Sequence, residues 1–177
     1  FTDAFALSQS GFLSAPWTAL TYMFLHGSVE HLLYNLFALV LFGLVLEVIV
    51  GEKRFLFIYF ASGIAAAVGS LLFYPASIGA SGAIFGLLGC LAVLRPRMTV
   101  WLGGVPMPMI FALFVWAAID MFGLFFPGSV ANAAHLCGLA FGIAMGLRLR
   151  REFGEKARPR KGNPPFSNEE FRLWDNR

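Results

Sequence analysis

The chain has 177 residues, of which 58% are hydrophobic and only 13% are charged, and its formal net charge is +3. A soluble domain of this length cannot bury so much apolar surface, so the composition excludes an ordinary soluble globular protein. Several stretches approach the roughly 20 apolar residues that a helix needs to cross a bilayer. We therefore expect an all-α, polytopic membrane protein built as a bundle of helices.

The N-terminal stretch, residues 1–28, precedes the first long apolar segment. Its first 15 residues contain neither a basic region nor a cleavage site of small residues, so they do not resemble a signal peptide. We expect residues 1–28 to form a loop outside the membrane. Because the chain begins at Phe1 rather than Met, we also expect that a segment upstream has been removed.

Five apolar segments follow, at about residues 29–50, 55–74, 79–94, 106–126 and 130–147. The connections between them are short and rich in Gly, Pro and charge, so consecutive helices should run antiparallel and side by side. The third segment is the shortest, at about 24 Å for a rise of 1.5 Å per residue, against a hydrocarbon core of about 30 Å. Its outer end should therefore lie below the membrane surface, under a water-filled cavity.

The positive charges predict the orientation. Nine of the 13 Lys and Arg residues follow the last segment, and the other four lie in alternate loops, namely Lys53, Arg54, Arg95 and Arg97. All of them fall on one side, which the positive-inside rule assigns to the cytoplasm. We expect residues 29–150 to form the membrane domain. Residues 151–177 should form a basic cytoplasmic tail, either solvated or in contact with anionic headgroups.

Polar side chains inside apolar segments are costly and are candidates for function. Four of them, from three segments that run inward, share one layer near the outer surface: His31, Asn35, Ser81 and His135. Glycines repeat every three or four residues in the third and fifth segments, and such stripes let helix backbones approach closely in lipid. Packing these two segments together would bring Ser81 near His135.

The four residues suit nucleophilic catalysis. A serine hydroxyl becomes reactive when a neutral histidine takes its proton, which His135 could do for Ser81. The helix start at Ser81 offers unpaired N–H groups for an oxyanion, and His31 and Asn35 could add side-chain donors. Asp120 is placed deeper in the membrane by its segment, so no carboxylate is expected beside His135, and the prediction is a Ser-His dyad.

Each residue also has a non-catalytic interpretation. A single serine in a span usually bonds the carbonyl one turn back, and a single histidine usually bonds another helix. A channel or transporter would need polar groups continuing to the cytoplasmic side, where only Glu47 and Asp120 lie deeper. A metal site built from His26, His31 and His135 would have no carboxylate or cysteine in the same layer, so neither a metal nor a cofactor is expected.

Three motifs resemble those of the rhomboid intramembrane serine proteases. GASGAIFG around Ser81 is similar to their G-x-S-G motif, HLLYN with His31 and Asn35 to their H-x-x-x-N, and AHLCGLAFG with His135 to their A-H-x-x-G-x-x-x-G. The resemblance covers about residues 17–147. It implies that Ser81 and His135 are catalytic, and that His31, Asn35 and Ser81 surround the oxyanion.

The resemblance also extends to the surroundings of these motifs. The residues expected to support the site are Gly79, Gly82, Phe85 and His26. His26 matches a histidine often found five residues before the first motif, and Phe85 replaces a tyrosine that stacks on the catalytic histidine. Trp17-Thr18 stands where a Trp-Arg pair is common. The family has a six-helix core, so five of six spans are expected here, with one more upstream.

We interpret the sequence as that of a rhomboid-type intramembrane serine endopeptidase. Its expected partners are transmembrane protein substrates and the lipid bilayer, with no nucleic acid. The expected location is the cell membrane, with several spans and the active site toward the extracytoplasmic side. The alternative is a catalytically silent relative that binds membrane proteins, which would require loss of the serine or the histidine, and both are present.

Overall fold

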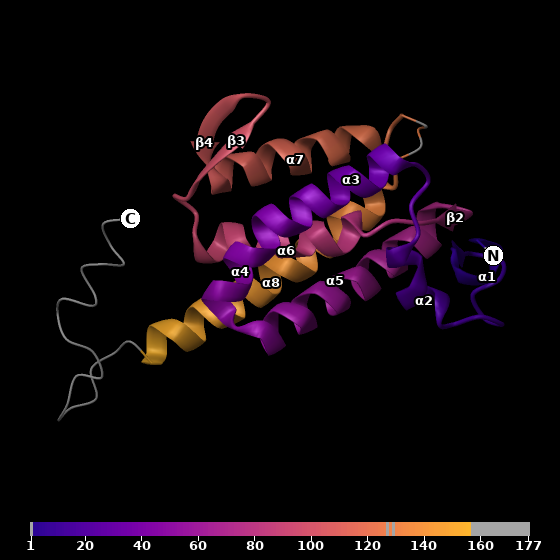
Figure 1. Cartoon of the computed structure of the whole chain (residues 1–177), viewed down its shortest axis with the longest axis horizontal. Helices are drawn as coiled ribbons and strands as arrows, with labels where there is room; N and C mark the ends of the chain where they lie inside the picture. Colours follow the sequence, from indigo (N-terminus) through magenta and orange to yellow (C-terminus); the bar gives the residue numbers. More distant parts are fainter. Residues whose placement is uncertain (1, 127, 129, 157–177) are drawn as a thin grey trace.

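Apolar helices dominate the part of the chain that the computed structural model describes, residues 2–126, 128 and 130–156 (Figure 1). Within this part, three helices are long and apolar enough to cross a membrane: Val29–Val50, α5 (Glu52–Phe73) and the Asn132–Phe153 portion of α8 (Asn132–Lys156). Two apolar helices are shorter: α6 (Ser81–Leu94) and α7 (Met109–Gly123). All five follow the predicted order, so the predicted helical membrane bundle is confirmed. The predicted tail lies outside the described residues from residue 157 onward.

The first long helix is continuous from α3 (Val29–Ala38) through the π-helical turn η2 (Leu39–Gly43) to α4 (Leu44–Val50). It begins at Val29 because the Ser28 side chain accepts a hydrogen bond from the His31 N–H, at 3.1 Å, and so caps the first turn. It ends at Val50, and the next residue, Gly51, has a φ of 85° that would strain any residue with a side chain.

Short elements of the N-terminal segment gather at one end of the bundle, together with β2 (Figure 1). They are α1 (Thr2–Phe5), β1 (Leu7–Ser8), α2 (Thr18–Thr21) and the 3-10 helix η1 (Tyr22–Phe24). Strand β1 pairs antiparallel with β2 (Ala76–Ser77), so that Leu7 lies opposite Ser77. This pairing ties the N-terminal segment to the stretch that leads into α6.

A β-hairpin lies at the opposite end, between α6 and α7 (Figure 1). Its antiparallel strands are β3 (Thr99–Leu102) and β4 (Val105–Pro108), joined through Gly103 and Gly104. The hairpin takes up residues that we had predicted as the start of the fourth span at residue 106. Pro106 and Pro108 have no N–H to donate to a helix, and α7 begins directly after Pro108. The predicted span was therefore too long at this end.

The third and fifth apolar helices pack backbone to backbone. Ten of the 14 residues of α6 are buried, so α6 is the central helix of the bundle. Gly138 and Gly142 of α8 lie against the carbonyl oxygens of Gly82 and Gly86 of α6, where a Cβ would have no room. The predicted close packing of the two glycine stripes is confirmed. It fixes the distance between the helices that carry Ser81 and His135.

Candidate active site

Ser81 is the first residue of α6, and hydrogen bonds fix the turn that precedes it. Gly79 has a φ of 122°, which glycine adopts without strain. Its N–H donates to the Tyr22 carbonyl oxygen at 2.9 Å, and the buried Tyr22 hydroxyl donates to the Gly63 carbonyl oxygen of α5 at 2.7 Å. The N-terminal segment and α5 thus position the turn that presents the Ser81 hydroxyl, which is half-buried.

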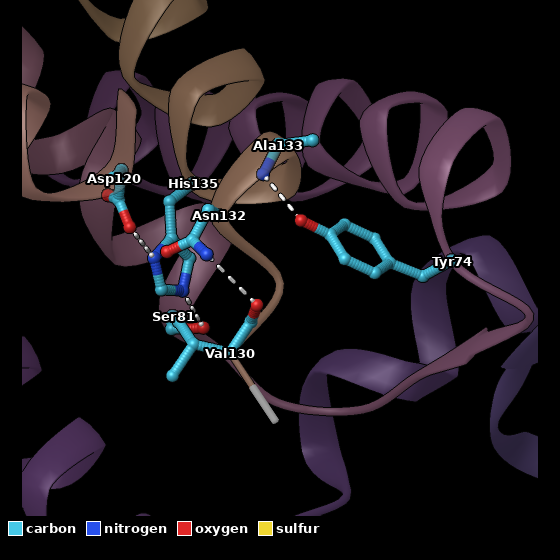
Figure 2. Close-up of polar contacts among 7 residues, drawn as sticks. All are labelled: Tyr74, Ser81, Asp120, Val130, Asn132, Ala133 and His135. Atoms are coloured by element: carbon cyan, nitrogen blue, oxygen red, sulfur yellow. Dashed lines mark hydrogen bonds and ion pairs between the residues drawn. The ribbon is translucent and has the colours of Figure 1, made fainter. Parts of the chain in front are cut away.

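His135 is the fourth residue of α8 and lies opposite Ser81. Its Nε2 is 2.8 Å from Ser81 Oγ, a hydrogen-bond distance (Figure 2). The residue is only 9% exposed. The Phe85 ring, one turn after Ser81, stacks on the imidazole with centroids 4.3 Å apart and an interplanar angle of 11°. The structure therefore brings together these three of the predicted site residues.

A carboxylate also reaches His135, and here the sequence-based expectation was wrong. Asp120 Oδ1 lies 3.0 Å from His135 Nδ1, on the side of the ring away from Ser81 (Figure 2). We had extended the fourth span to residue 126, which placed Asp120 too deep. Because α7 ends at Gly123, Asp120 lies in its last turn, in the same layer as His135. A fourth segment that ended at Gly123 would have placed Asp120 nearer the layer of His135.

The other predicted residues lie beside this group without bonding to it. The His31 ring approaches the Gly79 backbone so closely that a Cβ there would lie 2.9 Å from His31 Cε1 and 3.8 Å from Ser81 Oγ. The His26 ring meets His31 edge to face, with centroids 5.0 Å apart. Asn35 is buried, and its Nδ2 donates to the His31 carbonyl oxygen at 2.8 Å. Within the described part of the chain, the hydrogen bonds of Ser81 include neither His31 nor Asn35.

Gly82 supports the site through packing. A Cβ at this position would collide with the Cβ of Ala66 on α5, so a side chain here would push α6 away from α5. Gly82 also receives Gly138 of α8 against its carbonyl oxygen. The residue that follows Ser81 is thus in contact with both neighbouring helices, α5 and α8.

Two contacts that hold the start of α8 were not foreseen. The Tyr74 hydroxyl, at the end of α5, accepts a hydrogen bond from the Ala133 N–H at 3.1 Å (Figure 2). The first N–H groups of a helix have no partner within it, so Tyr74 acts as a cap for α8. Asn132 packs against Gly123 of α7, and its Nδ2 donates to the Val130 carbonyl oxygen at 3.3 Å. A tyrosine 59 residues upstream gives no local signal of such a cap.

Among the residues that the structure describes, no group of three or more His, Cys, Asp or Glu side chains is arranged to hold a metal ion. A cavity of about 620 Å³ lies at the far end of α8 from His135, lined by Ala144, Leu147, Arg148, Arg151 and Glu152. The water-filled cavity expected above Ser81 stays a prediction.

Known proteins share this sequence pattern. The rhomboid domain family matches residues 14–152. The chain is 33% identical over 132 residues to the putative rhomboid protease YdcA of Bacillus subtilis, covering 73% of this chain and 65% of YdcA. It is 36% identical over 146 residues to the rhomboid protease GluP of the same organism, covering 79% of this chain and 28% of GluP.

A third relative is the rhomboid protease GlpG of Haemophilus influenzae, at 30% identity over 135 residues, which cover 76% of this chain and 70% of GlpG. The chain spans less than two thirds of the length of YdcA and of GluP. The family match covers most of the chain, including every residue of the site. This chain is a membrane protein that belongs to the rhomboid family.

Proposed function

We propose that this protein is an intramembrane serine endopeptidase that hydrolyses a peptide bond in or beside a transmembrane helix of another membrane protein. The observation that carries the proposal is the 2.8 Å contact between Ser81 Oγ and His135 Nε2 at a half-buried helix start. A serine next to a histidine base is the arrangement needed for nucleophilic attack on a carbonyl. Relatives that are named rhomboid proteases support the same reaction.

The reaction requires two proton transfers through His135 for each acyl transfer. His135 Nε2 takes the Ser81 proton as Oγ bonds to the scissile carbonyl carbon, whose π electrons move to oxygen. The tetrahedral intermediate collapses as the C–N bond breaks, and His135 gives its proton to the leaving amine. Water then attacks the Ser81 ester as His135 takes one of its protons. The C–O bond to Ser81 breaks and His135 returns the proton to Oγ, so each cleaved peptide bond consumes one water molecule.

The negative charge on the oxyanion needs donors near Ser81. The N–H groups at the start of α6 have no partner within the helix and lie at the positive end of its dipole. His31, beside Gly79, is close enough to this turn to add a side-chain donor. The Asn35 amide carries two N–H donors and uses one of them for the His31 carbonyl oxygen, so we assign the other to the oxyanion.

We also propose the orientation and the location. Ser81 and His135 lie near the starts of inward-running helices, at the end of the bundle whose loops carry no Lys or Arg. The opposite end carries charge, including the 2.6 Å ion pair between Arg54 and Glu152. The positive-inside rule then puts the site at the extracytoplasmic side of a cell membrane, with residues 1–28 outside and residues 29–150 as the membrane domain.

The nucleophile can be tested with a fluorophosphonate probe and a reporter transmembrane substrate, both added to detergent-purified protein. Wild type should be labelled at Ser81 and should cleave the reporter. Ser81→Ala should do neither, because it lacks the attacking oxygen. His135→Ala should lose turnover and be labelled more slowly, because the hydroxyl has lost its base.

A control variant removes a different buried hydroxyl, so that the effect of losing the Ser81 nucleophile can be distinguished from the effect of losing a buried hydroxyl in general. Ser70 of α5 is 1% exposed, and its hydroxyl has no hydrogen-bond partner within the described residues. Ser70→Ala should therefore be labelled and cleave at wild-type rates. Reporter cleavage by purified Ser81→Ala would overturn the proposal.

A further inference from the structure

The two ring nitrogens of His135 face different partners. Nε2 faces Ser81 Oγ at 2.8 Å, and Nδ1 faces Asp120 Oδ1 at 3.0 Å. The two ring nitrogens of a neutral imidazole carry one hydrogen between them, and only the nitrogen without it can accept a proton. For His135 to take the Ser81 proton, the ring hydrogen must therefore be on Nδ1.

Asp120 supplies the group that would keep it there. An ionised carboxylate can only accept hydrogen bonds, so Oδ1 pairs with Nδ1 only when Nδ1 carries the hydrogen. Asp120 is 3% exposed and His135 is 9% exposed, so water competes little for this bond. Hydrogen bonds are stronger in such surroundings than in water.

We infer that Asp120 is a positioning residue that holds His135 in the tautomer able to accept the Ser81 proton. The inference rests on the proposed function for its importance to catalysis, whereas the tautomer itself is a property of the folded protein. It replaces the expected Ser-His dyad with a pair that is oriented by a third residue.

The ring has little freedom to adopt another arrangement. Ser81 and Asp120 contact opposite edges of the imidazole, and Phe85 covers one face. The end of α7 is also docked on the start of α8, since a Cβ at Gly123 would lie only 2.5 Å from Asn132 Nδ2. Asp120 is three residues before this contact and is therefore held at a fixed distance from His135.

The carboxylate would act again when the ring becomes charged. When Nε2 has taken the Ser81 proton, the imidazolium lies beside Asp120, which stabilises it while the other proton stays on Nδ1. Asp120 Oδ2 is buried and has no hydrogen-bond partner within the described part of the chain. A buried oxygen without a partner is costly, so the hydrogen bond between the imidazole N–H and Oδ1 matters more for this carboxylate.

The test combines kinetics with ¹⁵N NMR of the histidine rings in the detergent-purified protein. The sequence contains only three histidines, so His135 can be assigned by comparison with the His135→Ala spectrum. In the neutral form of the wild-type ring, the hydrogen should be on Nδ1. Asp120→Ala should shift the hydrogen toward Nε2 and should lower kcat by about 10²- to 10⁴-fold at unchanged KM.

Glu47→Gln is the matched control, because it removes a carboxylate from an apolar helix at the other end of the bundle. It should leave kcat and the His135 tautomer unchanged. If Asp120→Ala does not fold, Asp120→Asn keeps the shape of the side chain without its charge. A reduced kcat at unchanged melting temperature in that variant supports the inference, and a wild-type kcat overturns it.

The outcomes separate this inference from the proposed function. An unchanged His135 tautomer in folded Asp120→Ala overturns the role of Asp120, even if wild type cleaves its substrate. If wild type cleaves nothing, the proposed function fails. A tautomer that still depends on Asp120 would then support the positioning role alone.

Discussion

The helices that carry Ser81 and His135 are packed far more closely than α7, which carries Asp120. Backbone meets backbone where α6 and α8 cross, as at Gly86 and Gly142. By contrast, α7 buries four residues, Met109, Ala112, Leu113 and Asp120. Its other side exposes large apolar side chains that include Phe111, Phe114, Ile119 and Phe122. One half of the site rests on rigid backbone contacts, and the other on the narrow face of an outer helix.

The two hydrogen bonds of His135 therefore depend on different helix contacts. The Nε2 contact with Ser81 depends on α6 and α8, whose separation cannot shrink or grow without a change in backbone packing. The Nδ1 contact with Asp120 depends on how α7 docks at its last turn. A substitution in the glycine stripe should therefore disturb the contact between Ser81 and His135 together with the fold, whereas a change at the edge of the site should affect activity with less effect on stability.

The largest effect is expected at Gly142. In Gly142→Ala the new Cβ meets the Gly86 carbonyl oxygen of α6, which cannot move aside as a flexible side chain could. Such overpacking costs about 3 kcal/mol and forces the helices apart, so cleavage should be lost as well. Thermal unfolding of the detergent-purified variant and reporter cleavage measure the two consequences.

Gly11→Ala provides the control for adding a methyl group to a glycine. A Cβ at Gly11 would make an ordinary contact, 3.7 Å from the Ser8 side chain. It should leave the melting temperature and cleavage unchanged. If Gly142→Ala behaved like Gly11→Ala, close packing of α6 on α8 would not be what sets the distance between Ser81 and His135.

A smaller effect is expected at Tyr74, which caps α8 from α5. Tyr74→Phe keeps the ring but leaves the Ala133 N–H without its 3.1 Å hydrogen bond. Loss of a helix cap costs about 1 kcal/mol, and fraying of the first turn would also displace His135. We expect a lower melting temperature and a reduced kcat. Tyr34→Phe on α3 removes a hydroxyl from a side chain that is 77% exposed, and identical results for the two variants would contradict the capping role.

Much of the close-packed region could be predicted from the sequence, because its determinants are local and periodic. Glycine stripes predict close helix approach, and Ser81 and His135 each follow the start of a segment that was predicted to run inward, so both were predicted to fall in one layer. The short third segment was also predicted, and α6 has 14 residues. These features depend on spacing along one helix.

The β3–β4 hairpin, the end of α7 and the Tyr74 cap could not be predicted as well, because they depend on where a helix begins or ends. Assigning residues 106–126 to one span overlooked the β3–β4 hairpin at one end and the helix end at Gly123 at the other. The error of about one turn moved Asp120 out of the layer of His135. The Tyr74 cap depends on two helix ends meeting in space, which no pattern in the sequence indicates.

The smallest effect is expected in the loop before α3, where His26 lies. Burial lowers the pKa of His26 and the neighbouring His31 lowers it further, while a hydrogen bond to the Phe24 backbone acts in the opposite direction. The folded protein therefore resists protonation of this ring, whose Nε2 is buried without a hydrogen-bond partner among the described residues. As the pH falls below the ordinary value of 6.5, the unfolded chain binds a proton that the folded chain does not, so stability decreases.

Thermal unfolding between about pH 8 and pH 5 tests this at His26, since these values bracket the titration of an ordinary histidine. The melting temperature of wild type should fall on acidification by more than that of His26→Gln, which has no titrating ring at this position. Every other titrating group is present in both proteins, so the difference between the two slopes isolates His26. Equal slopes would mean that His26 binds its proton equally well in the folded and unfolded chains. The loop before α3 would then accommodate a charged His26, whereas the contact of α6 with α8 does not accommodate even an added methyl group.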